Sequence, residues 1–166
     1  MKDDLLQRVP HIGGDSEEDT DLLLKMAETA RAYIQSFAWC PAIDEILFGD
    51  GVGGIVAVFL VRFSSKIGGA DDELWVVVGD LPSAYMVVEA GEAPSDALAK
   101  YCELMEDWAA AVTKRGSLKA VFPVSAPATV ENAFLLQQRL RFLREEIIGQ
   151  PPPFARRIKE RWPKRG

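Results

Sequence analysis

Apolar residues recur at three- and four-residue spacing in three stretches of the chain, a pattern typical of amphipathic helices. Asp15 or Ser16 is placed to cap the first helix and Thr129 to cap the third, because such side chains accept hydrogen bonds from free backbone N–H groups. A proline at an early position marks the start of the second helix. The predicted helices cover about residues 16–37, 94–113 and 130–148.

Between the first and second helices the pattern changes to short runs of β-branched and aromatic residues, separated by Gly, Asp, Pro or Ser. The connections are too short for crossover helices, so consecutive runs should pair as antiparallel strands. The sequence therefore predicts an α+β fold, an antiparallel four-stranded β-meander with three α-helices packed on one face. The predicted strands are Ile43–Phe48, Ile55–Phe63, Glu73–Gly79 and Ala84–Glu89, with a further short extended piece at Leu118–Val124.

The length of 166 residues fits a single domain with flanking segments. Residues 1–14 lack periodicity and are expected to form a flexible leader, residues 15–149 the α+β domain, and residues 150–166 a basic tail that begins with prolines. The longest apolar run, Ile55–Val61, is too short to span a membrane, and the N-terminus has no signal-peptide pattern. The two cysteines are far apart in sequence, and together these features indicate a cytoplasmic protein without disulfides.

Charge is unevenly distributed along the chain. Lys and Arg number 19 against 25 Asp and Glu, a net charge of −6. Residues 150–166 carry a net charge of +5, which leaves −11 on residues 1–149. An acidic body repels phosphate, which argues against nucleic acid and anionic membranes as partners and favours a basic protein partner.

One glycine-rich segment, Gly49–Gly54, matches the spacing G-x-G-x-x-G of dinucleotide-binding loops. Such a loop needs a helix directly after it, whose free N–H groups bind the pyrophosphate. Here β-branched residues follow, so a hairpin turn is the preferred interpretation and a phosphate cradle the alternative. Gly51 and Gly53 are the candidate ligand-binding residues of this segment.

Asp50 and Asp80 are candidate ligand-binding carboxylates. Both are expected in turns of the meander, the first and the third, which lie at the same end of an antiparallel sheet. Two carboxylates there could flank a Mg²⁺ ion or a basic side chain. Asp80 can also be an ordinary turn residue, because Pro82 follows it and its side chain can bond nearby backbone N–H groups.

The remaining titratable residues do not predict a metal or catalytic site. Glu103, Glu106 and Asp107 lie on one helical face without a histidine, which indicates a solvated polar face. The single histidine, His11, lies in the leader without a nucleophile or acid partner nearby. One histidine and two cysteines are too few for a zinc site, so no metal and no cofactor is expected, and no catalytic residue is assigned.

The tail has an amphipathic pattern of its own. Phe154, Ile158 and Trp162 share one helical face, and Arg157 and Arg161 are among the cations around it. Such a segment can dock on a protein partner, a membrane surface or nucleic acid. It can equally pack on its own acidic body or on a second copy of the chain, which leaves a homodimer open. These five residues are the candidate partner-binding residues.

The run Leu74–Tyr85, with the sequence LWVVVGDLPSAY, resembles a segment of small bacterial proteins grouped as a domain of unknown function. This resemblance implies a cytoplasmic bacterial protein and transfers no catalytic residues. In size and charge the chain is also similar to immunity proteins of bacterial toxin systems. The resemblance covers about residues 74–148. Outside the run it rests on Ala97, Tyr101, Met105, Glu106, Trp108, Phe122-Pro123-Val124 and Leu136–Phe142.

These features favour a non-enzymatic protein-binding module, immunity-like or regulatory, whose acidic surface meets a basic protein partner. The alternative is a Mg²⁺-dependent hydrolase or nucleotide-binding enzyme that uses Asp50 and Asp80. A third interpretation is a nucleic-acid accessory protein that binds through the basic tail.

Overall fold

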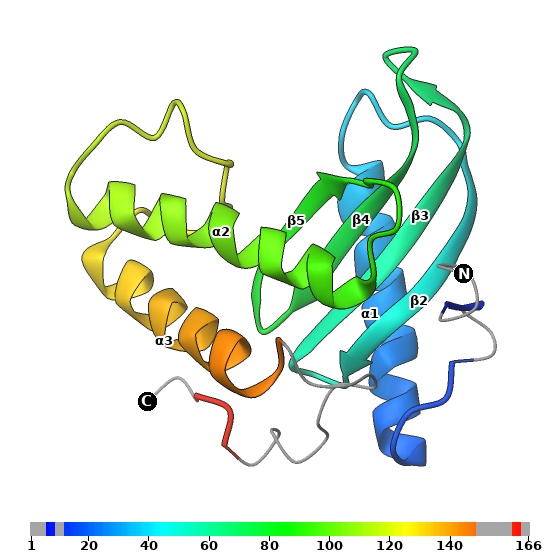
Figure 1. Ribbon diagram of the computed structural model, residues 1–166, viewed down its shortest axis with the longest axis horizontal. Helices are drawn as coiled ribbons and strands as arrows, with labels where there is room; N and C mark the ends of the chain where they lie inside the picture. The colour runs from blue at the N-terminus through cyan, green and yellow to red at the C-terminus, as the bar shows by residue number, and fades with distance from the viewer. Residues whose placement is uncertain (1–5, 9–11, 149–160, 164–166) are drawn as a thin grey trace.

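An antiparallel sheet of five strands forms the centre of the fold, and its strands are neighbours in the order in which they follow along the chain (Figure 1). The computed structural model describes residues 6–8, 12–148 and 161–163. Each strand pairs with the next through a short turn, apart from the first, which is separated from the second by a helix. The strands are β1 (Gln7–Arg8), β2 (Ile43–Val52), β3 (Val56–Ile67), β4 (Asp71–Gly79) and β5 (Leu81–Val87).

The predicted meander is confirmed as β2 to β5, but the prediction of four strands is wrong. The additional strand, β1, lies in the segment that was expected to be a leader, where Gln7 pairs with Phe48 and Arg8 with Leu47. A strand of two residues is too short to show a hydrophobic period, so the sequence pattern does not reveal it. The extended piece expected at Leu118–Val124 forms no strand, since it belongs to a connection without regular structure.

The three predicted helices are confirmed. The hydroxyl of Ser16 accepts a hydrogen bond from the N–H of Asp19 at 3.1 Å, and that of Thr129 accepts one from Asn132 at 3.1 Å, so two of the helices have side-chain caps. Pro94 occupies the first turn of the second helix. The helices are α1 (Glu17–Gln35), α2 (Pro94–Thr113) and α3 (Val130–Glu146).

The helices cover both faces of the sheet, which corrects the prediction that all three pack on one face. α1 lies behind the sheet in Figure 1, whereas α2 lies in front of it and α3 packs on α2, beside the sheet. Side chains of β3 alternate between the two faces of the sheet. Phe59 and Val61 belong to the core cluster on the α1 side, and Val58 and Leu60 belong to the cluster that contains residues of α2 and α3. All four side chains are fully buried, as expected for a central strand covered on both faces.

Two side chains of α2 protect β5, the edge strand next to it. The hydroxyl of Tyr101 donates to the carbonyl of Pro82 at 2.5 Å, and Nζ of Lys100 donates to the carbonyl of Val87 at 2.7 Å. These bonds occupy backbone groups of an edge strand that would otherwise be free to pair with another chain. They also fix α2 beside the turn that joins β4 to β5.

Candidate functional site

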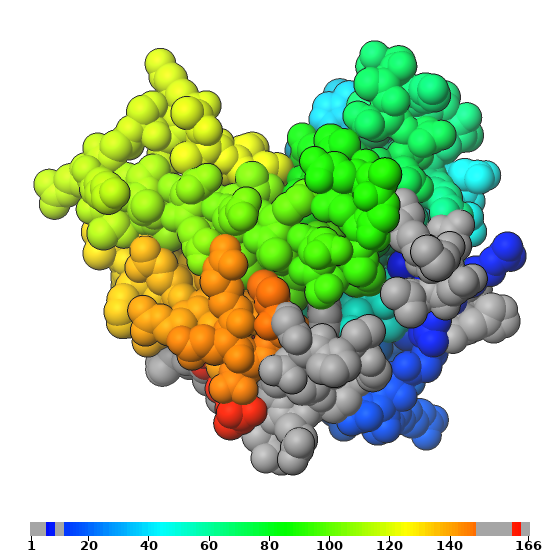
Figure 2. Space-filling view, viewed as in Figure 1, coloured from blue at the N-terminus to red at the C-terminus, as the bar shows by residue number. Residues whose placement is uncertain are grey.

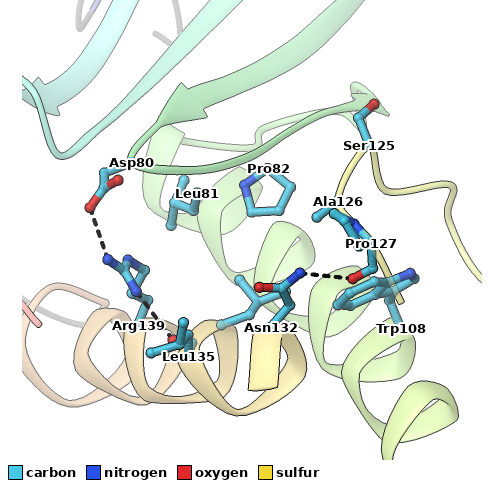
Figure 3. A pocket seen from close by; sticks show the side chains of 11 residues that line it. Asp80, Leu81, Pro82, Trp108, Ser125, Ala126, Pro127, Asn132, Leu135 and Arg139 are labelled. Carbon is cyan, nitrogen blue, oxygen red and sulfur yellow. Dashed lines mark hydrogen bonds and ion pairs between the residues drawn. The ribbon is translucent and has the colours of Figure 1, made fainter. Parts of the chain in front are cut away.

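A pocket of about 430 Å³ lies between the β4–β5 turn, α2, α3 and the connection of the two helices (Figure 3). Most of its wall is apolar. Asp80 and Arg139 lie at one end and Trp108 at the other, with Asn132 between them. A concave, mostly apolar site with a few polar groups has the character of a ligand-binding pocket. The apolar lining includes Leu81, Pro82, Trp108, Pro127, Leu135 and Leu136.

Gly79 fixes the shape of the turn that carries Asp80. Its φ of 153° is one that side-chain-bearing residues rarely adopt, and a Cβ atom at this position would overlap the backbone carbonyl of Ile55. That carbonyl accepts a hydrogen bond from the backbone N–H of Asp80 at 2.9 Å. The glycine thus lets the β4–β5 turn rest on the β2–β3 turn and directs Asp80 toward α3.

Arg139, on α3, is a buried arginine with only 3% of its side chain exposed. Its Nη2 donates to Oδ2 of Asp80 at 3.1 Å, and its Nη1 makes a long contact of 3.5 Å with the carbonyl of Leu135. Its Nε has no hydrogen-bond partner within the described part of the chain. A buried donor without a partner costs about 1–3 kcal/mol, so this N–H is available to donate to a ligand atom or a water molecule.

Trp162, near the C-terminus, completes the cluster at this end of the pocket. Its indole Nε1 donates to the same Oδ2 of Asp80 at 3.1 Å, and its ring centroid lies 5.8 Å from Cζ of Arg139. The ring also meets Phe142 edge-on at 5.6 Å between centroids. In Figure 2, residues 161–163, in red, lie against the end of α3, in orange. The tryptophan is buried, and it stabilises the ion pair from outside the pocket lining.

Asp50 is buried inside β2, opposite Val58, so the expectation that it lies in a turn is wrong. The turn contains Gly53 and Gly54 instead, and the N–H of Ile55 closes it by a hydrogen bond to the carbonyl of Val52 at 3.0 Å. Gly54 has a φ of 78°, which this tight turn requires. One carboxylate oxygen of Asp50 accepts from the N–H of Gly51 at 2.8 Å.

The hairpin interpretation of the glycine-rich segment is confirmed, because β3 follows it instead of a helix. The backbone N–H of Gly53 donates to the buried carboxylate of Asp19 on α1 at 2.7 Å. A Cβ atom at Gly51 would lie 2.8 Å from the backbone of Ala57. Both glycines therefore allow the close packing of this hairpin.

The first and third turns of the meander lie at the same end of the sheet, as predicted, since Val56 pairs with Gly79. The carboxylate of Asp80 is nevertheless bonded to Arg139 and Trp162. A guanidinium beside a carboxylate opposes the binding of a divalent cation, because the two positive charges repel. Among the described residues, no three His, Cys, Asp or Glu side chains form a group that could hold a metal ion.

Two of the five candidate partner-binding residues of the tail lie in the part of the chain that the structure describes. Arg161 forms an ion pair with Glu146 at 3.1 Å, and Trp162 packs on the body as described above. Both contacts agree with the interpretation that the tail packs on its own acidic body. The other three candidates, Phe154, Arg157 and Ile158, lie outside the described residues.

Among the described residues, the acidic face of α2 and the two cysteines lie outside the pocket lining. Glu106 receives Arg144 in two hydrogen bonds of 2.7 Å, and these raise the pKa of the guanidinium. Glu103 and Asp107 are exposed, as expected for a solvated polar face. Burial raises the pKa of the Cys102 thiol to about 12 and also raises the pKa of Cys40, so neither thiol is activated as a nucleophile.

Sequence reasoning did not identify Arg139, although a signal was present. Leu136, Arg139 and Leu143 follow one another at three- and four-residue spacing, which places the arginine on the buried stripe of α3. A charged residue on a buried stripe requires a partner of opposite charge. Within the described residues that partner is Asp80.

No helix in the described part of the chain is both long and apolar enough to cross a membrane. Comparison of the chain with family models, with curated proteins and with solved structures gives no match, so the function has to be argued from the site itself.

Proposed function

We propose that this chain is a binding module and not an enzyme, and that the pocket between the β4–β5 turn, α2 and α3 is its recognition site. The observation that carries the proposal is Arg139, a buried cation at the end of an apolar pocket whose Nε has no partner within the described residues. Buried polar groups are nearly always hydrogen-bonded, and the exceptions call for an explanation. A bound ligand atom provides one.

The arrangement of the pocket favours binding over catalysis. Of the two carboxylates considered for a hydrolase, Asp50 is buried in β2 and Asp80 shares Oδ2 between two donors. Nucleophilic catalysis needs an activated side chain next to a base. The described pocket lining contains one hydroxyl, that of Ser125, and no histidine or cysteine beside it.

The proposal is tested by mapping small fragments onto the full chain with nuclear magnetic resonance. We expect a subset of apolar fragments to shift the side-chain signals of Trp108 and Asn132 together, because both residues line the pocket. Ala126→Phe should abolish these shifts by filling the pocket from its lining. Ala128→Phe is the matched control, since Ala128 is an exposed residue of the same connection outside the lining. The proposal would be wrong if no fragment shifted these signals, or if the shifts were the same in the Ala126→Phe variant.

A second candidate function, binding of a basic protein partner, is favoured by one surface. Glu17, Glu18 and Asp21 are exposed on α1, and none of them forms an ion pair within the described residues. Exposed charges of one sign raise association rates with an oppositely charged partner. The products of neighbouring genes are the partners to mix with this chain first.

The test of this second function compares two variants in which acidic side chains are neutralised, one with three changes on α1 and one with two changes on α2. Glu17→Gln, Glu18→Gln and Asp21→Asn together should slow association at low salt, whereas Glu103→Gln with Asp107→Asn on α2 should leave it unchanged. An association rate that does not respond to the α1 changes or to salt would exclude this surface.

A further inference from the structure

We propose that the pocket takes an organic carboxylate with a compact apolar body, and that the guanidinium of Arg139 receives the carboxylate. The inference rests on the proposed function, because it names the ligand class of the same pocket.

The walls of the pocket call for an apolar body. Leu81 and Pro82 form one side, Leu135 the other, and Trp108 the far end from Arg139. Leu136 also lines the pocket. Burial of apolar surface contributes about 25 cal/mol per Å², so such walls stabilise hydrocarbon and aromatic groups. The volume of about 430 Å³ lies in the lower part of the range of roughly 300–1,000 Å³ for small-molecule sites, which limits the ligand to a compact molecule.

The two charged residues of the lining differ in their contact with water. The side chain of Arg139 is 3% exposed, whereas that of Asp80 is 36% exposed. Water screens the half-exposed carboxylate more strongly than the buried guanidinium. We therefore expect the interior of the pocket to favour a negative charge on the ligand, although the two residues carry opposite charges.

The N–H donors of the Arg139 guanidinium can bind a negatively charged group of the ligand. A guanidinium carries five N–H donors in one plane. Nη2 donates to Asp80, the contact of Nη1 to the carbonyl of Leu135 is long, and Nε has no partner among the described residues. A ligand carboxylate at Nε forms a charge-assisted hydrogen bond, about twice as strong as a neutral one. Asp80 acts as the positioning residue, because it holds the guanidinium in place.

Ligands of other charge fit this end of the pocket less well. A neutral amide satisfies Nε but adds no charge-assisted bond. An ammonium group would have to pair with Asp80, whose Oδ2 is already shared by Arg139 and Trp162. These differences give a ranking that an experiment can measure: carboxylate, then amide, then amine.

The test uses three probes that share one apolar body: 4-phenylbutanoate, 4-phenylbutanamide and 4-phenylbutylamine. Their dissociation constants are measured on the full chain by calorimetry, and the shifts of Trp108 and Asn132 locate the binding. We expect the carboxylate to bind at least tenfold more tightly than the amide, with the amine weakest. Equal binding of all three at the pocket, or tightest binding of the amine, would overturn the ligand class and leave the binding function intact. Absence of binding by all three, together with the failure of the fragments above, would overturn both.

Variants of Arg139 provide a second measurement. Arg139→Gln should bring the carboxylate to within about threefold of the amide, whereas Gln138→Ala, a change on the exposed side of α3, should keep the tenfold preference. The comparison of probes on the unaltered chain decides the proposal by itself if Arg139→Gln fails to fold. An undiminished preference in a folded Arg139→Gln variant would contradict the role of the guanidinium.

The same chemistry is offered by a free acid and by the C-terminal residue of a polypeptide. N-acetylglycylleucine and its amide separate these sources. Binding of the peptide acid more tightly than 4-phenylbutanoate, with loss on amidation, would identify a polypeptide C-terminus as the ligand. Weaker binding of the peptide acid would identify a small free carboxylate.

Discussion

The indole N–H of Trp162 donates a hydrogen bond to Oδ2 of Asp80 at 3.1 Å, although 82 positions separate the two residues in the sequence. Through this bond the described end of the chain is fastened to the β4–β5 turn. Arg139 bonds to the same oxygen atom, so one carboxylate holds α3 and the C-terminal residues together. The stability of the pocket is therefore linked to a residue that does not line it.

Replacement of Trp162 should separate the hydrogen bond from the packing of the ring. Trp162→Phe keeps an aromatic ring against Phe142 but removes the indole N–H, and should lower the free energy of unfolding by about 1 kcal/mol. Trp162→Ala also removes the buried ring and should cost about 2–4 kcal/mol. Both values are measured by urea denaturation.

Trp39→Phe is the control for this pair, because Trp39 is 38% exposed and its indole N–H has no hydrogen-bond partner within the described residues. We expect it to change the free energy of unfolding by less than about 0.5 kcal/mol. Equal losses for Trp162→Phe and Trp162→Ala would show that the ring packing contributes nothing.

The ion pair of Asp80 and Arg139 should respond asymmetrically to the loss of either partner. Asp80→Ala leaves a buried guanidinium without its carboxylate and should cost about 2–4 kcal/mol. Arg139→Met replaces the cation with an apolar side chain and leaves a carboxylate that water can reach, so it should cost less than about 1.5 kcal/mol. Urea denaturation of both variants tests this order, and the reverse order would contradict the burial argument. Asp107→Ala, at an exposed position of α2, is the control.

Gly79 should be intolerant of any side chain. Gly79→Ala places a Cβ atom on the carbonyl of Ile55 at a φ of 153°, so the turn that carries Asp80 must move. We expect a loss of more than about 3 kcal/mol, measured by thermal or urea denaturation. Gly68→Ala is the matched control: its φ is 58°, but the new Cβ meets no atom within 4 Å, so a loss of about 1–2 kcal/mol is expected. Similar losses for both variants would show that the contact with Ile55 is not limiting.

The repeating parts of the fold could be predicted from the sequence because their signals are local. Apolar spacing and a capping hydroxyl at Ser16 or Thr129 define a helix without reference to the rest of the chain. The layer arrangement was predicted wrongly, with all helices on one face, although Val56–Val61 is apolar at every position, as is typical of a strand covered on both faces. The short connections of the meander do not show that α1 packs behind the sheet, because that depends on contacts between distant segments.

The candidate site was only half predictable for the same reason. Asp80 could be identified from its place in a turn, but its partners Arg139 and Trp162 lie 59 and 82 positions away. No local sequence pattern predicts contacts between residues so far apart in the chain. These contacts form because α3 packs along α2, next to the β4–β5 turn. Asp50 was misplaced because two further glycines after Gly51 move the turn beyond it.

Glu92 should make part of the stability depend on pH. Burial by itself raises the pKa of this carboxyl, but hydrogen bonds from the N–H of Glu89, from Lys100 and from the indole of Trp75 outweigh it, so the net pKa is lowered. A lowered pKa stabilises the fold above the ordinary carboxyl pKa of about 4.3, and this contribution is lost as the pH falls through the lowered value. Glu92→Gln should therefore cost about 1–3 kcal/mol at pH 7, and its difference from the unaltered chain should shrink below about pH 4. Urea denaturation at several pH values measures both, with the exposed Glu103→Gln as the control; a difference that is constant down to about pH 3 would contradict the electrostatic origin of this contribution.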